Sequence, residues 1–129
     1  MEIALRAALI DWLAADPTLS ATLNAIVEEA PLRASLPWLA IAASTSADWS
    51  CKTHPGREVR IAVELHCRGD RPDSAADLVA QIESRAAALP RAQAGFSIVT
   101  CQFLRARAEQ RGESRRAILL ESRFRLLAE

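Results

Sequence analysis

Apolar and polar residues alternate from Glu58 to Cys67, and this alternation constrains the fold more than any other feature of the chain. Successive side chains of a β-strand point to opposite faces, so alternation predicts a strand with one face buried and the other in solvent. The face to be buried carries Val59, Ile61, Val63, Leu65 and Cys67, and the other carries Glu58, Arg60, Glu64 and His66, with the small Ala62 as the one break. The chain must therefore build a sheet and cover one side of it.

A polar segment, residues 44–57, leads directly into this strand. It contains the only lysine of the chain, Lys52, together with Trp49, Pro55 and Gly56. Because the segment holds turn-forming residues and little to bury, we expect a flexible arm beside a sheet edge. Trp49 has no apolar neighbours in the sequence, so it either anchors a partner or folds back over the sheet edge, and the sequence favours neither reading.

Helical periodicity predicts a helix over residues 2–15, which Asp16 and Pro17 should end because the residue before a proline disfavours the helical conformation. Thr18 or Ser20 is expected to cap a short turn after it. Two apolar runs then predict strands, a short edge strand within residues 24–30 and a strand over residues 38–42 that starts after Pro37.

The second half of the chain predicts a turn at residues 69–72 and a helix that runs to Leu89, with Asp73 or Ser74 as its cap. Two further strands, residues 96–108 and 115–127, are separated by a glycine-containing turn and read as a long β-hairpin. We therefore expect an α+β fold, with a mostly antiparallel sheet of four to five strands and two helices packed on one face. Trp12 and Trp38 are expected in the core.

The length of 129 residues fits one domain, residues 1–129, and the formal net charge of zero gives no general attraction to nucleic acid or to an acidic membrane. The charge is nevertheless uneven, because residues 1–56 carry three basic and six acidic side chains. Such asymmetry either helps identical subunits meet head to tail or is an accident of the surface. Three cysteines without paired spacing argue against a disulfide framework, and we see no signal peptide or membrane-spanning run.

Metal binding and catalysis find little support in the residue pattern. Cys51 and His54 precede the neighbours His66 and Cys67, but neighbours in a strand point to opposite faces and do not converge on one zinc ion. The carboxylates of residues 70, 73 and 77 resemble a metal-dependent nuclease site, although capping of a helix explains all three. We expect no cofactor, no metal and no enzyme activity, with a nuclease-like enzyme as the alternative.

Arginines crowd the C-terminal hairpin, with glutamates between them. Cross-strand Arg–Glu pairs on a solvated sheet face account for this pattern, and contact with DNA phosphates is the competing interpretation. A monomeric accessory protein that contacts DNA is therefore a further alternative. The candidates for contact with DNA or with the lumen of a ring are Arg105, Arg107, Arg115 and Arg123.

Nearly the whole chain resembles the tail-completion, or tail-terminator, proteins of long-tailed phages and of phage-derived gene transfer agents. The resemblance rests on the order of short motifs: the opening helix with Asp16-Pro17, the segment Leu36 to Ile41, the Asp48-Trp49-Ser50-x-Lys52 arm, the strand with His66, the helix from Asp73 and the hairpin that ends Arg123-Phe124-Arg125. The acidic segment Glu28 to Arg33 departs from the family pattern. The resemblance gives no choice between a phage, a prophage and a gene transfer agent.

The resemblance implies a structural protein that forms a ring, usually of six subunits, on the tail tube. Such a ring stops tube polymerisation and docks the head–tail connector or stopper protein, with passing contact to packaged DNA and none to a membrane. We expect cytoplasmic assembly followed by residence in the particle. From the arm we expect the contact with a neighbouring subunit or partner, through Asp48, Trp49, Lys52, His54 and Arg57.

Overall fold

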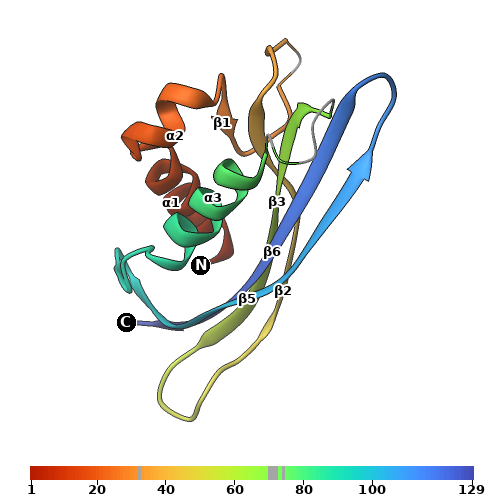
Figure 1. Ribbon diagram of the computed structural model, residues 1–129. Coiled ribbons are helices and arrows are strands. Elements are labelled where there is room, and N and C mark those ends of the chain that lie inside the picture. Colours follow the sequence, from red (N-terminus) through yellow and green to blue (C-terminus); the bar gives the residue numbers. More distant parts are fainter. Residues whose placement is uncertain (32, 70–72, 74) are drawn as a thin grey trace.

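The computed structural model describes residues 1–31, 33–69, 73 and 75–129 of the chain. Its described elements form an α+β fold in which three helices cover one face of a curved six-stranded sheet (Figure 1). The helices are α1 (Glu2–Ala14), α2 (Pro17–Thr22) and α3 (Ala76–Ala87), and the strands are β1 (Ile26–Val27), β2 (Trp38–Asp48), β3 (Gly56–Arg68), β4 (Ala92–Gln93), β5 (Phe96–Gln110) and β6 (Arg115–Ala128).

The strands are arranged in the order β1-β2-β3-β6-β5-β4, so β3 and β6 occupy the centre. All neighbours are antiparallel except β1, which runs parallel to β2. The expected fold class is confirmed, but four to five strands and two helices were too few. The sequence missed β4 and α2 as regular elements because a two-residue strand and a six-residue helix carry almost no periodic signal.

The helix caps differ from those expected. Asp16, which follows α1, is itself the cap of α2, because its Oδ1 accepts hydrogen bonds from the amides of Thr18 and Leu19. Neither Thr18 nor Ser20 takes that role. At α3 the capping residue is Ala75, without a side-chain hydrogen bond, so Asp73 is not the cap.

Some expectations fall on residues that the structure does not describe. The other expected cap of α3, Ser74, lies outside the described residues. Most of the turn expected at residues 69–72 lies outside them as well. Asp77 does stand in the first turn of α3, where its charge suits the helix dipole.

The polar arm is largely a strand, which corrects the expectation of a flexible segment over residues 44–57. Strand β2 continues to Asp48 and pairs with β3 in continuous register from Ala43 opposite Ala62 to Asp48 opposite Arg57. Only residues 49–55 form the connecting loop. Small and polar residues join this strand because the regular backbone of β3 supplies hydrogen-bond partners along its whole length.

One core lies between the helices and the sheet. The alternating residues of β3 and β6 supply its floor, and α1 supplies Leu5, Leu9 and Leu13 as its cover. Phe124 and Leu126 of β6 are fully buried there. The apolar face predicted for β3 is therefore confirmed.

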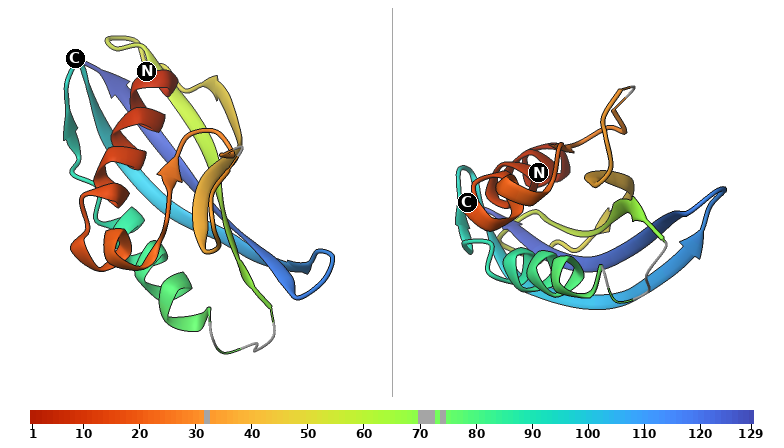
Figure 2. Two further views of the ribbon diagram at one scale, coloured as in Figure 1. Left: turned by 90° about the horizontal axis from the view of Figure 1, so that it is seen from above. Right: turned by 45° about the horizontal axis from the view of Figure 1, so that its top comes forward.

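The sheet curves around the helices, and the far end of the β5–β6 hairpin extends beyond them (Figure 2). The β2–β3 loop projects at the opposite end of the sheet. Among the described residues, no helix has both the length and the apolar character needed to span a membrane.

Candidate assembly surfaces

The β2–β3 loop, residues 49–55, is a compact turn. The hydroxyl of Ser50 donates to Asp48 Oδ1 at 2.7 Å and accepts from the amide of Gly56 at 2.9 Å, which ties the two strand ends together. Within the loop, the amide of Cys51 donates to the carbonyl of His54 at 3.0 Å. The tip is therefore ordered by its own hydrogen bonds and needs no partner for its shape.

Gly56 is required at the base of this loop. A Cβ atom there would lie 2.3 Å from the carbonyl oxygen of Trp49 and 2.8 Å from that of Leu126. Backbone atoms cannot move aside as the end of a flexible side chain can. The loop closes over the end of β6 only because this position lacks a side chain.

Trp49 folds back over the sheet. Its side chain is half-buried, and the guanidinium carbon of Arg125 lies 5.5 Å from the centre of its ring. Arg125 in turn donates from Nε to Glu58 at 3.0 Å. Of the two readings of Trp49 that the sequence left open, the packing favours the one in which the ring covers the sheet, and a role as partner anchor stays a prediction.

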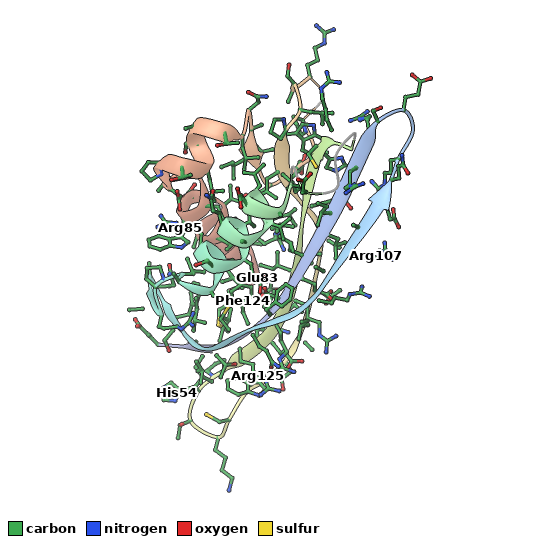
Figure 3. The ribbon with its side chains drawn as sticks, viewed as in Figure 1. His54, Glu83, Arg85, Arg107, Phe124 and Arg125 are labelled. Carbon is green, nitrogen blue, oxygen red and sulfur yellow. The ribbon has the colours of Figure 1, made fainter. Side chains whose placement is uncertain are left out.

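The five residues expected at an interface gather at this end of the sheet. Lys52 and His54 are exposed in the loop, Asp48 stands opposite Arg57 at the strand ends, and Trp49 is the most buried of the set. Figure 3 shows His54 at the far end of the molecule from the β5–β6 tip. The structure therefore brings the predicted set together without testing its use.

The environment of Cys51 makes its thiol more acidic than usual. Its Sγ lies 3.6 Å from the hydroxyl of Thr53, which also lies 2.9 Å from Nδ1 of His54. Hydrogen bonds from Thr53, and more weakly from His54, lower the pKa of Cys51 to about 7. Burial instead raises the pKa values of Cys67 and Cys101.

The residues considered for zinc do not converge. Cys67 is buried on the helix-covered face, whereas His66 lies on the other face and stacks on Trp38 with ring centroids 3.9 Å apart. Within the described residues there is no group of three His, Cys, Asp or Glu side chains that could hold a metal ion. One acid of the proposed nuclease cluster, Asp70, lies outside the described residues.

The uncovered face of the sheet carries a network of ion pairs, which includes cross-strand Arg–Glu pairs of the kind that the sequence predicted. Arg105 of β5 pairs with Glu121 of β6 at 3.1 Å, and Arg123 of β6 lies 3.7 Å from Glu58 of β3. Arg107 instead pairs with Glu109 of its own strand at 3.1 Å. Arg115 is exposed at the start of β6, at the hairpin tip. Contact of these arginines with DNA stays a prediction.

A second cluster on this face was not singled out in the sequence. Glu64 lies 2.7 Å from Nε2 of His66 and accepts from Arg111 at 3.2 Å, and Arg111 also binds Glu109. These contacts, first with Glu109 and then with Glu64, raise the pKa of Arg111. The alternation places Glu64 and His66 on one face, but only the register of β3, β6 and β5 brings Arg111 to them.

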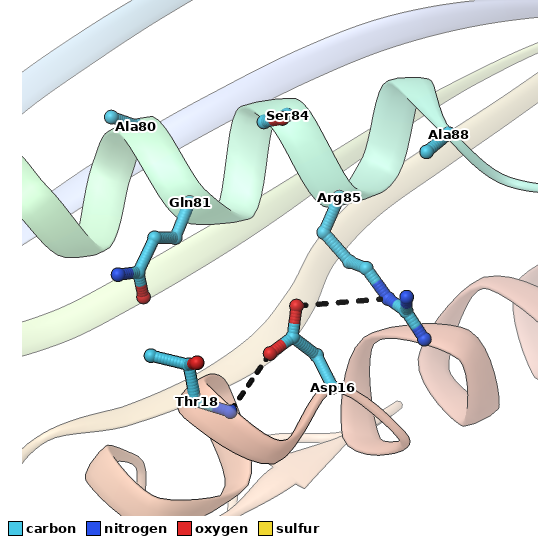
Figure 4. Close-up of a pocket in the computed structure, with 7 residues that line it drawn as sticks. All are labelled: Asp16, Thr18, Ala80, Gln81, Ser84, Arg85 and Ala88. Atoms are coloured by element: carbon cyan, nitrogen blue, oxygen red, sulfur yellow. Dashed lines mark hydrogen bonds and ion pairs between the residues drawn. The ribbon is translucent and has the colours of Figure 1, made fainter.

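A surface pocket of about 450 Å³ lies between α2 and α3 (Figure 4). Its polar wall is formed by Asp16 and Arg85, whose charged groups are 3.9 Å apart. Arg85 is also engaged by Trp12, so its guanidinium serves the packing of the helices.

Comparisons with known proteins place this fold among proteins of phage-like particles. A chain in a solved structure titled "Virion of native gene transfer agent (GTA) particle" superimposes with a TM-score of 0.78 at 25% sequence identity, over 97% of this chain and 96% of that one. No curated protein matches by sequence. The family model described as "Tail completion protein gp17" matches residues 7–127, and the chain therefore belongs to this family of phage tail completion proteins.

Proposed function

We propose that this protein closes the tail tube of a phage or gene transfer agent particle as a ring of identical subunits. The ring caps the tube, stops its polymerisation and presents a docking surface to the head–tail connector or stopper protein. Six subunits form the ring, as the resemblance implies, and packaged DNA passes it. Assembly takes place in the cytoplasm, after which the ring is part of the particle.

One observation carries this proposal, namely a likeness that extends over nearly the entire chain. The family model leaves only a few residues at each end unmatched, and the related chain of the gene transfer agent virion is covered almost completely. The whole described fold, including both projecting hairpins, thus has a counterpart in a chain of an assembled particle.

The exposed tip of the β2–β3 loop is the surface that we assign to a neighbouring subunit or partner. It projects beyond the helices, and it is held in shape by the Ser50 hydrogen bonds before any partner arrives. A preformed tip loses little conformational entropy on binding, which favours its use as a contact. Lys52 and His54 supply the exposed polar groups, with Asp48 and Arg57 at its base.

Native mass, measured by light scattering over a concentration series with and without tail-tube protein, tests the proposal. A closed oligomer, formed alone or only on the tube, together with tubes that stop growing, is the expected result. A protein that stays monomeric at every concentration, with and without tail-tube protein, would contradict the proposal. Metal analysis and DNA binding at several salt concentrations would then test the enzyme and DNA-binding alternatives.

A further inference from the structure

Strands β2 and β5 have outer edges that are mostly without a partner strand within the part of the chain that the structure describes. Strand β4 pairs with β5 only at Phe96 and Ser97, and β1 pairs with β2 only at Leu39 and Ala40. The remainder of each strand borders no described strand on its outer side. Unpaired N–H and C=O groups along such edges are a template for pairing with another chain.

Hydrogen bonds at the two ends of β2 show which of its amides face outward. The amide of Leu39 donates outward to Ala25, and that of Trp49 donates inward to Gly56. Amides alternate between the two sides of an antiparallel strand, and the bulge after Ile41 shifts this alternation by one residue. In the regular stretch that follows the bulge, the outward amides belong to Ser44, Ser46 and Asp48.

The same reasoning applies to β5. The amide of Ile98 donates outward to Arg91, and that of Arg111 donates inward to Arg115. Irregularities after Ile98 and after Phe103 each shift the alternation. In the regular stretch beyond the second one, the outward amides belong to Ala106, Ala108 and Gln110.

The two stretches match in length, direction and face. Three antiparallel pairings separate β2 from β5, so β5 of one copy meets β2 of a similarly oriented copy in the antiparallel sense. In both stretches the residues with outward amides belong to the helix-covered face. Ser44 accepts a hydrogen bond from Arg6 of α1, and Ala106 stands opposite the buried Leu120. A sheet joined in this way therefore keeps the helices of both copies on one side.

Charge favours this pairing over pairing of like edges. Antiparallel alignment brings the hairpin tip of one copy, with the exposed Arg115, to the beginning of the regular part of β2 in the next copy. There Glu28 and Glu29 line a surface pocket of about 330 Å³ beside residues 41–44, together with Arg6, which lies 3.7 Å from Glu28. Two β5 stretches paired with each other would instead place Arg105 across from Arg111, and like charges in opposite positions are unfavourable.

We propose that residues 106–110 of β5 in one copy pair antiparallel with residues 44–48 of β2 in the next copy, with Arg115 of the hairpin tip against Glu29. The contact is heterologous, and a heterologous contact closes a ring when the rotation between neighbouring copies divides a full turn, which is what the proposed ring requires. This inference rests on the proposed function, because it specifies how subunits of that ring meet.

Cross-linking of two single-cysteine variants tests the pairing. In a Cys51→Ser background, one sample carries Ser46→Cys with an affinity tag and the other carries Ala108→Cys without a tag. Both positions stand at the centres of the two stretches. The samples are mixed, assembled with tail-tube protein and treated with a short bismaleimide. The Cys51→Ser protein alone gives the background from Cys67 and Cys101.

A dimer that contains one tagged and one untagged chain is the expected product, with neither variant cross-linking to itself. Self-cross-linking of the Ala108→Cys variant would overturn the inference in favour of paired β5 edges. An oligomer without the mixed dimer would overturn the inference and leave the proposed function standing. Failure of any oligomer to form would contradict the proposed function, and the inference with it.

Two further variants test the hydrogen bonds and the charges separately. Ala108→Pro removes an outward N–H and leaves the β5–β6 ladder intact, so assembly should be lost while the monomer still folds, and Ala108→Ser, which keeps the N–H, should assemble normally. Glu29→Arg should weaken assembly about tenfold, and adding Arg115→Glu should restore it. Unchanged assembly of the proline variant, or no rescue by the charge swap, would count against the pairing.

Discussion

The guanidinium carbon of Arg85 lies 3.3 Å from the centre of the Trp12 ring, and the two residues also exchange hydrogen bonds. Trp12 donates from its indole nitrogen to the carbonyl of Arg85 at 2.7 Å, and Arg85 donates from Nε to the carbonyl of Trp12 at 2.9 Å. This reciprocal pair fixes the end of α1 to the last turn of α3. Trp12 was expected in the core, whereas it is half-buried and packs against the core with a satisfied N–H.

Arg85→Ala should lower the free energy of unfolding by about 1–3 kcal/mol, because it removes the stacked cation and leaves the carbonyl of Trp12 without its donor. Urea unfolding followed by circular dichroism measures the effect. Arg60→Ala, at an exposed position on β3, is the matched control and should change stability by less than about 0.5 kcal/mol. Equal effects of the two substitutions would contradict the role given to Arg85.

Phe124→Ala should be much more costly, about 3–5 kcal/mol, because the ring is fully buried in the core and its removal leaves a cavity. Val99→Ala offers a comparison on the neighbouring strand, since Val99 is 47% exposed. Thermal unfolding of both variants against the parent measures the difference. A Phe124 variant as stable as the Val99 variant would mean that the core is packed differently.

Gly56→Ala should destabilise the β2–β3 hairpin by about 1–3 kcal/mol, because the new Cβ would overlap the carbonyl oxygens of Trp49 and Leu126. Gly95 provides the control. It has a φ of 86° and open space around it, so alanine there meets only backbone strain. Hydrogen exchange of the amides at the ends of β2 and β3 should rise in the Gly56 variant alone, and unchanged protection there would refute the close approach.

Cys51 should react with iodoacetamide near neutral pH, with half-maximal rate near its pKa of about 7. The sign follows from the direction of the shift, since a lowered pKa populates the nucleophilic thiolate at lower pH. Thr53→Val removes the largest cause and should move the midpoint upward. Mass spectrometry of the labelled peptides checks this, and Cys67 serves as the buried, slow reference. If the pH midpoint of the reaction is the same in the Thr53→Val variant, the hydrogen bond between Thr53 and Cys51 does not lower the pKa of the thiol.

Lys52→Ala combined with His54→Ala should leave the stability of the monomer within about 0.5 kcal/mol, because both side chains are exposed. If the loop tip contacts a neighbour, this double variant should assemble less completely in the light-scattering assay. Glu83→Ala, at an exposed position of α3 away from the loop, is the control for a surface change elsewhere (Figure 3). Full assembly of the double variant would remove the tip from the interface.

The local residue pattern was sufficient to predict an element where apolar and polar residues follow the period of that element. The alternation from Glu58 to Cys67 predicted β3 with both its faces, and two strand-like segments on either side of a glycine-containing turn predicted the β5–β6 hairpin. Residues 43–48 gave no such signal, because they are small or polar. They form a strand because β3 offers them a continuous row of backbone partners.

The contacts within the candidate surfaces depend on tertiary structure more strongly than the strands do. The sequence identified Trp49, Lys52 and the C-terminal arginines as residues of interest, but not that Trp49 folds back under Arg125 or that Arg105 is paired with Glu121. Trp38 was expected in the core, but it is buried on the uncovered face of the sheet, where it stacks on His66 outside the core cluster. Its face was not predictable, because an apolar run after a proline does not say which residues turn toward the helices.

The sequence by itself determined the class of fold, the central strands and the resemblance to tail completion proteins, since these follow from periodicity and motif order within short segments. Only the tertiary structure decided the order of the strands, the face on which Trp38 meets His66, and the edges of β2 and β5 that border no other strand among the described residues. Strand pairing joins residues far apart in the chain, and register depends on backbone hydrogen bonds that every residue except proline can make. For that reason neither the order of the strands nor their register can be predicted from the side chains alone.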